Sequence, residues 1–102
     1  MHFLLIYDLS PDYLERRTAF RAEHLALAWK TAGEGRLILG GALADPVDRA
    51  ILLFEGDTAA VGENFARADP YVRNGLVTAW HVRPWTTVVG NLAATPVRPV
   101  PE

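Results

Sequence analysis

A nearly continuous apolar run at the start of the chain, from His2 to Tyr7, places the strongest constraint on the fold. Its residues favour β-structure, they do not alternate with polar ones, and Asp8 ends the run. A strand with this pattern is typical of the centre of a sheet, where both faces are covered. The chain therefore needs further strands to flank this one and helices to cover it.

The next segment, residues 11–33, has the pattern of a long amphipathic helix. Ser10 is a preferred N-cap residue, and Pro11 suits the first helical position because its missing N–H has no helical partner there. Placing the residues at intervals of about 100° gives one expected buried face. The residues of that face are Leu14, Thr18, Leu25, Ala28, Trp29 and Ala32.

Four neighbouring side chains follow one margin of this expected face. They are Arg17, Phe20, Arg21 and His24, whose i, i+3, i+4 and i+7 spacing stacks them on successive turns. Imidazole changes its charge near neutral pH, whereas guanidinium holds a fixed positive charge. We therefore expect this margin to form a small polar site.

Residues 36–43 and 49–55 are predicted strands, and the short loop at 45–48 makes them an antiparallel hairpin. Gly40 and Gly41 are unfavourable inside a strand. Such glycines mark either a bulge or tight packing, or a place where a ligand or a partner chain comes close to the backbone. Both interpretations stay open, and the second makes Gly41 a candidate ligand-binding position.

A second helix is predicted to begin near Asp57 or Thr58. It ends at Pro70, because the residue before a proline is pushed out of the α region. Asp69 is therefore a helix-terminal carboxylate at a turn. We expect it to meet His24 over the sheet and to complete the polar site.

The last predicted strand covers residues 76–89, and Pro84 implies that its later part lies at an edge or bends away. Three prolines in the tail favour an extended arm without a core. A chain of 102 residues is too short for a second core. We therefore expect one domain, residues 1–90, followed by a proline-rich C-terminal extension, residues 91–102.

The element order β-α-β-β-α-β predicts an α+β domain with a four-stranded antiparallel sheet and both helices on one face. The other face is rich in Leu, Ile, Val and Trp. It cannot stay in water without exposing an apolar patch of several hundred Å². We therefore expect this face to pack on a second copy, which makes the protein a homodimer or a higher homo-oligomer.

Composition excludes several functional classes. The net charge of −2 and the scattered basic residues argue against a nucleic-acid surface. Without cysteine there is no disulfide, no thiolate nucleophile and no cysteine-bearing zinc site. The three histidines lack metal-ligand spacing and no phosphate-binding glycine loop is present, so we predict no metal and no cofactor.

The sequence also argues against a membrane location. No apolar run reaches membrane-spanning length, and the N-terminal run is too short for a signal peptide. The lack of cysteine fits a reducing compartment. We therefore expect a cytoplasmic protein without a membrane partner.

The chain resembles a known family, the YciI-like proteins (YCII-related domain), over roughly residues 1–89. The resembling blocks are Arg21-x-x-His24-Leu25, Glu34-Gly35-Arg36-Leu37, Gly40-Gly41, Ala66-x-Ala68-Asp69-Pro70-Tyr71-Val72, Gly75-Leu76-Val77 and Val82-Arg83-Pro84-Trp85. The resemblance implies a ferredoxin-like βαββαβ fold of the dimeric α+β barrel type. It also implies an active site in which the family's His and Asp match His24 and Asp69. The tail after Asn91 departs from the family pattern.

One branch of this family looks like lyases that eliminate chloride from a chlorinated hydroxyquinol, and the wider superfamily includes muconolactone isomerases and small monooxygenases. The resulting hypothesis is a cofactor-independent lyase or isomerase acting on a small, cyclic or aromatic, oxygenated compound. His24 is the predicted general acid and base, and Asp69 orients it. Arg17 and Arg21 are predicted to hold negative charge on the ligand, and Tyr71 to donate a hydrogen bond.

Plainer interpretations of the same residues remain open. The two arginines can form ordinary ion pairs, Tyr71 can pack beside the Asp-Pro turn, and His24 can serve only to satisfy Asp69. The chain is then either a non-catalytic module that binds a small metabolite or a dimerisation module.

Overall fold

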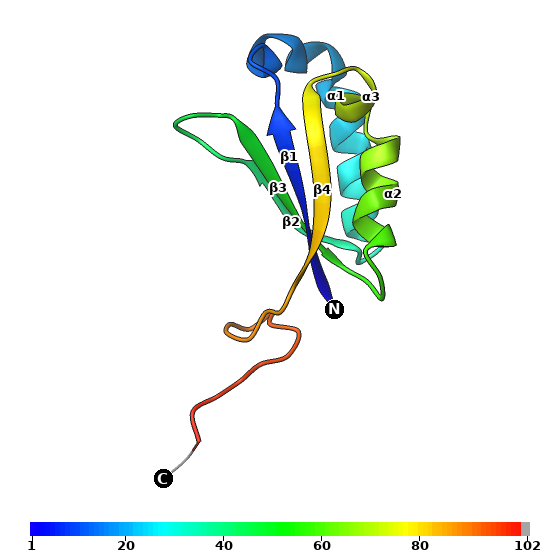
Figure 1. Cartoon of the computed structure of the whole chain (residues 1–102). Helices are drawn as coiled ribbons and strands as arrows, with labels where there is room; N and C mark the ends of the chain where they lie inside the picture. Colours follow the sequence, from blue (N-terminus) through cyan, green and yellow to red (C-terminus); the bar gives the residue numbers. More distant parts are fainter. Residues whose placement is uncertain (101–102) are drawn as a thin grey trace.

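The computed structural model describes residues 1–100, which form a four-stranded sheet with helices on one face (Figure 1). The elements in chain order are β1 (His2–Leu9), α1 (Tyr13–Gly33), β2 (Leu37–Ala42), β3 (Arg49–Glu55), α2 (Ala60–Ala68), α3 (Pro70–Arg73) and β4 (Val77–Trp85). This order confirms the predicted β-α-β-β-α-β arrangement. The short helix α3 was not predicted.

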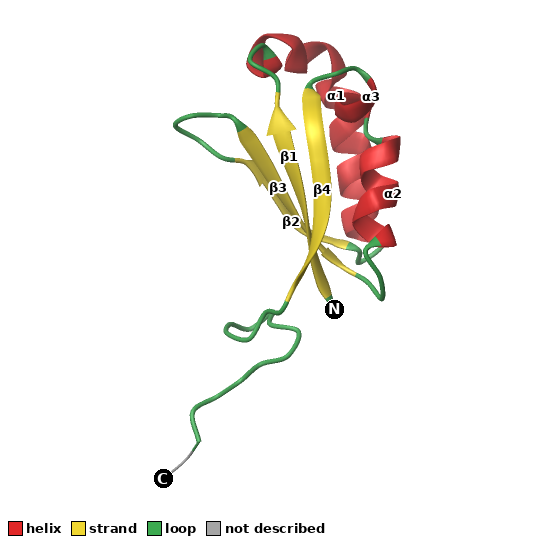
Figure 2. Cartoon of the chain, in the orientation of Figure 1, coloured by secondary structure: helices red, strands yellow, loops and turns green. Residues whose placement is uncertain are grey.

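The strand β1 lies at the centre of the sheet, whose order is β2-β3-β1-β4. It pairs antiparallel with both β3 and β4, so that Leu5 lies opposite Leu52 and Val82. The helices α1 and α2 lie together on one face of the sheet (Figure 2). The predicted α+β fold with an antiparallel sheet is therefore confirmed.

In a single chain, β1 is fully buried on one face only, apart from His2 at its start, whereas its sequence predicts burial on both faces. Phe3, Leu5 and Tyr7 point into the core under the helices and are buried. Leu4 and Ile6 alternate with them on the face that carries no helix and are half-buried. We call this second side the open face of the sheet.

The buried face of α1 differs from the predicted one. Leu14, Leu25 and Trp29 are exposed, and Trp29 is 75% exposed, whereas Tyr13 and Thr31 are buried. The helix packs against both β2 and α3, and this contact turns a stripe with aromatic and polar members inward. Apolar spacing was right for Ala28 and Ala32, which pack against the core, and wrong for Leu14, Leu25 and Trp29.

Both long helices begin two or three residues later than predicted. The hydroxyl of Ser10 donates to the Asp12 carboxylate (2.6 Å), and Asp12 takes the N-cap position of α1. The hydroxyl of Thr58 accepts from the backbone N–H of Ala60 (3.3 Å), the first residue of α2. In each case a side chain stabilises a turn before the helix.

The strand β4 ends at Trp85, whereas the prediction extended it to residue 89. Residues 86–100 contain neither helix nor strand and lead away from the sheet (Figures 1 and 2). Within residues 1–100, no helix combines the length and the apolar character needed to cross a membrane.

The same Leu→Ala substitution should lower the free energy of unfolding by different amounts on the two faces of β1. Leu5→Ala removes a side chain with no exposed surface and should lower the free energy of unfolding by about 2–5 kcal/mol. Leu4→Ala on the open face is the matched control and should cost less than half as much in dilute protein. Urea unfolding of both variants measures the difference, and equal losses would contradict a core confined to the helix side.

Candidate functional site

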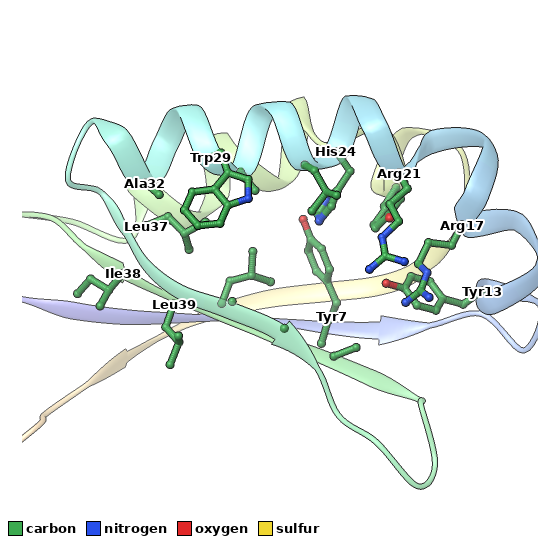
Figure 3. A pocket seen from close by; sticks show the side chains of 18 residues that line it. Tyr7, Tyr13, Arg17, Arg21, His24, Trp29, Ala32, Leu37, Ile38 and Leu39 are labelled. Atoms are coloured by element: carbon green, nitrogen blue, oxygen red, sulfur yellow. The ribbon is translucent and has the colours of Figure 1, made fainter.

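A cavity of about 420 Å³ lies between α1 and the β2 side of the sheet (Figure 3). Its walls come from α1, α3 and the strands β1, β2 and β3. Most of the lining is apolar. The titratable residues that line it are Tyr7, Tyr13, Arg17, Arg21, His24 and Tyr71.

Asp69 lies behind this cavity and is fully buried. Pro70 ends α2 and opens α3, so Asp69 joins the two helices in an extended conformation (φ −72°, ψ 122°) and acts as the N-cap of α3. Its Oδ1 accepts from the backbone N–H of Tyr71 at 3.0 Å. The predicted helix-terminal carboxylate is thus held at the sharp turn between two helices.

His24 and Tyr7 supply two further donors to the same carboxylate. Nδ1 of His24 lies 2.8 Å from Oδ1 of Asp69, and the Tyr7 hydroxyl donates to Oδ2 at 2.7 Å. A carboxylate can only accept hydrogen bonds, so Nδ1 of His24 carries the proton in this pair. In the neutral ring the lone pair then lies on Nε2.

The Nε2 atom of His24 opens to the cavity. Among the described residues, every buried side-chain nitrogen or oxygen has a hydrogen-bond partner. None of these residues forms a hydrogen bond with Nε2 of His24, so this atom is not buried. Solvent therefore reaches Nε2 through the cavity that His24 lines, and the side chain as a whole is 16% exposed. The ring stacks on Tyr71 with centroids 3.9 Å apart and planes within 9°. The stack holds the imidazole at one orientation.

Tyr7 was not recognised from the sequence as a site residue, because it reads as one more apolar member of a central strand. Burial, followed by the Asp69 charge and the hydrogen bond to it, raises the Tyr7 pKa far above its ordinary value. Tyr7 therefore stays protonated and acts only as a donor to Asp69. The sequence feature that could have identified Tyr7 is its phenol group, since a buried hydroxyl needs a hydrogen-bond partner.

Tyr71 keeps its proton at neutral pH for a similar reason. Burial, and then the neighbouring Tyr13, raises the pKa of Tyr71 to about 12, while Arg17 and Arg21 act in the opposite direction. Tyr71 lies in the cavity wall, beside the polar site where the sequence predicts it. Its hydroxyl is available as a hydrogen-bond donor.

Arg17 and Arg21 extend from α1 toward the sheet and line the cavity (Figure 3). The Arg17 guanidinium lies 5.6 Å from the centre of the Tyr13 ring. Residues 1–100 form six ion pairs by distance, and neither arginine takes part in one. Their positive charges therefore face the cavity without a carboxylate from the described chain.

Gly40 and Gly41 both line the cavity from β2, but they differ in packing. A Cβ atom at Gly40 would meet the Leu52 side chain at 3.3 Å, whereas a Cβ at Gly41 would meet nothing within 4 Å. The register of β2 against β3 shifts between Leu37 and Leu39, just before the glycines. Tight packing against Leu52 therefore accounts for Gly40, and the ligand role of Gly41 stays a prediction.

The other two histidines and the tryptophans are further candidates for chemistry or ligand binding. His2 bonds Thr87 at the base of the tail, and His81 is exposed on the open face. Trp29 lines the cavity, whereas Trp80 packs against the core. The described residues contain no cluster of three or more His, Cys, Asp or Glu side chains that could hold a metal ion.

Alkaline pH should test the role of Tyr7. A tyrosine whose pKa is raised on folding stabilises the protein fully below its unfolded pKa of 10.0, and this stability is lost as the pH rises above that value. The free energy of unfolding should fall by up to about 1.4 kcal/mol per pH unit for this group. In Tyr7→Phe the fall should be shallower by that amount. An unchanged slope in urea unfolding above pH 10 would contradict it.

Comparison with known proteins identifies one family whose model matches this chain and two solved structures of similar fold. A family model described as the YCII-related domain matches residues 1–86. A search of curated protein sequences finds no match.

The solved structures are similar in fold. The 5-chloro-2-hydroxyhydroquinone dehydrochlorinase (TftG) of Burkholderia phenoliruptrix, in complex with 2,5-dihydroxybenzoquinone, is 23% identical with a TM-score of 0.71, over 85% of this chain and 95% of that one. A NIPSNAP family protein of Agrobacterium tumefaciens is 14% identical with a TM-score of 0.57, over 91% and 95% of the two chains. The family model spans most of the sequence, and the chain therefore belongs to the YCII-related domain family.

Proposed function

We propose that this protein is a small cofactor-independent enzyme of the lyase or isomerase type, acting on a small cyclic or aromatic oxygenated compound. One observation carries the proposal. One nitrogen of His24 is held by a fully buried carboxylate, while the other opens to a cavity. A purely structural histidine would have both nitrogens satisfied and closed off.

In the proposed reaction, Nε2 of His24 removes a proton from a carbon next to a carbonyl group of the ligand. The electron pair of the broken C–H bond moves into the ring as an enolate or phenolate. Asp69 stabilises the imidazolium that forms. An isomerase returns the proton at another carbon. In a lyase the electron pair expels a leaving group from the neighbouring carbon as an anion, and the imidazolium releases its proton to that anion or to water.

The remaining site residues are proposed to stabilise the oxygen anion. Arg17 and Arg21 place two unpaired guanidinium groups at the cavity, and Tyr71 adds a protonated hydroxyl. Gly41 has no side chain and lines the cavity through its backbone, where the edge of a planar ligand can approach. No step of this scheme uses a cofactor.

Two further observations support a small ring as the ligand. A cavity of about 420 Å³ falls within the usual range of about 300–1000 Å³ for small-molecule sites. A protein of the same fold was crystallised with 2,5-dihydroxybenzoquinone and is named as a dehydrochlorinase. This ligand is planar, oxygenated and of suitable size, so it is a suitable probe for binding.

Substitution of His24 should separate binding from catalysis. His24→Gln should slow exchange of ring protons with D₂O, in a panel of hydroxyquinols and cyclic enols, by about a hundredfold to ten-thousandfold. Binding of 2,5-dihydroxybenzoquinone should change far less, since the arginines and Tyr71 remain. NMR follows exchange, and titration of the quinone absorbance follows binding.

His81→Gln is the matched control, because His81 is exposed, lies on the other face of the sheet and does not line the cavity. It should leave both exchange and binding unchanged. If wild-type protein binds the quinone but never exchanges a proton in the panel, the chain is a metabolite-binding module. If it does neither, the dimerisation module is the better interpretation.

We also propose a homodimer through the open face, and a cytoplasmic location. The face exposes apolar side chains of all the inner strands, including Leu4, Ile6 and Ile51, and a second copy would cover them. Burial on both sides would also explain why β1 lacks alternation.

A charge placed on the open face should break this dimer. Ile51→Lys should shift the protein to a monomer in sedimentation experiments, because an unpaired ammonium would be buried between two sheets. Ala26→Lys, on the exposed side of α1, is the control and should leave the assembly unchanged. A wild-type protein that is monomeric at high concentration would contradict the dimer.

A further inference from the structure

The chain carries a C-terminal arm, residues 86–100, that leaves the sheet after β4 and extends beyond the rest of the fold (Figure 1). Nothing in the proposed reaction uses this arm. It consists of an inner loop, residues 86–93, and an outer segment, residues 94–100.

The inner loop is tied to the sheet. Thr87 is buried, and its hydroxyl lies 2.7 Å from Nδ1 of His2, whose Nε2 lies 2.9 Å from the Glu55 carboxylate. The outer segment folds back on this anchor. The backbone N–H groups of Ala94 and Val97 donate to the Thr87 hydroxyl (2.8 Å) and to the carbonyl of Val88 (2.9 Å). The arm therefore starts from a fixed point and in a fixed direction.

The outer segment is held by backbone hydrogen bonds, but its two valine side chains are left exposed by the described chain. Val97 is 66% exposed and Val100 is 87% exposed. Pro96 and Pro99 precede them and limit the backbone, so that ordering the segment on a surface costs little entropy. A pre-ordered apolar segment of this kind is suited to docking rather than to solvation.

The inner loop encloses a hollow at the edge of the open face. This hollow has a volume of about 470 Å³, and its walls combine Leu53 and Trp85 of the sheet with residues 86–93 and His2. Leu53 lies opposite Leu39, and Trp85 opposite His2, on the side of the sheet without helices. The hollow is therefore continuous with the surface proposed to meet a second copy.

The exposed area of the chain is large enough to include a contact of this kind. The chain exposes 6767 Å², whereas a compact monomer of 11.2 kDa should expose about 5700 Å². The excess of roughly 1100 Å² is comparable to the ~800 Å² that each partner buries in a stable interface. The arm and the open face are the surfaces that a second copy would cover.

We propose that the outer segment of the arm docks on a second copy of this chain, with Val97 and Val100 entering the hollow beside Leu53 and Trp85. A two-fold axis makes the contact reciprocal, so each copy gives one arm and receives one. Arg98, the one charged residue of the arm, lies between the two valines. Docking brings it toward Glu55, which lies beside His2 at the wall of the hollow.

The inference shares with the proposed function only the presence of a second copy, and a cross-linking experiment can separate them. The chain contains no cysteine, so single cysteines can be introduced as unique probes. Val97→Cys and Leu53→Cys are made in separate full-length chains, mixed, and oxidised. The expected result is a covalent heterodimer, identified by mass spectrometry, that forms only in the mixture.

Val97→Cys mixed with Ala26→Cys is the matched control, because Ala26 lies on the exposed side of α1. Its yield should be at least about tenfold lower. An equal yield would overturn the arm contact. If the protein sediments as a dimer while the Val97–Leu53 mixture gives no heterodimer, the arm proposal fails and the open-face dimer stands. A monomer at all concentrations overturns both.

A second measurement does not depend on cysteines. Deleting residues 94–102 keeps Thr87 and the inner loop but removes the docking segment. The Kd of the dimer should rise by about tenfold or more, which corresponds to the loss of a few buried apolar side chains. Val97→Ser with Val100→Ser should have the same effect in the full-length chain. An unchanged Kd in both would overturn the proposal.

Discussion

The buried carboxylate of Asp69 is the constraint on which the site depends. A carboxylate removed from water costs several kcal/mol unless donors compensate it, and here three donors converge on one group. They come from β1, α1 and the start of α3. The same hydrogen bonds that make the burial of Asp69 tolerable therefore join three elements and fix the tautomer of His24.

The cavity follows from how α1 meets the sheet. The helix turns Tyr13 and His24 inward, and Leu25 and Trp29 line the cavity while staying largely exposed, so their side chains do not fill the space above β2. This packing sacrifices apolar burial that a purely structural helix would keep. As a result, the imidazole of His24 shares the cavity with two guanidinium groups and three hydroxyl groups.

The open face of the sheet and the C-terminal arm have one physical feature in common. Both expose apolar side chains that a single chain does not cover. A second copy would cover them together, because the hollow at the base of the arm continues into the open face. The proposed assembly thus completes the burial that the sequence of β1 predicts, without changing the site on the other face.

The sequence by itself determined the order of elements, the antiparallel sheet and the central place of β1, because these follow from local periodicity, turns and loop lengths. It also placed Asp69 at a helix end through Pro70. Only the tertiary structure decided which stripe of α1 faces inward, and that Tyr7 shares the Asp69 carboxylate. Those features depend on contacts between residues 45 to 62 positions apart, and spacing along one helix or strand contains no information about them.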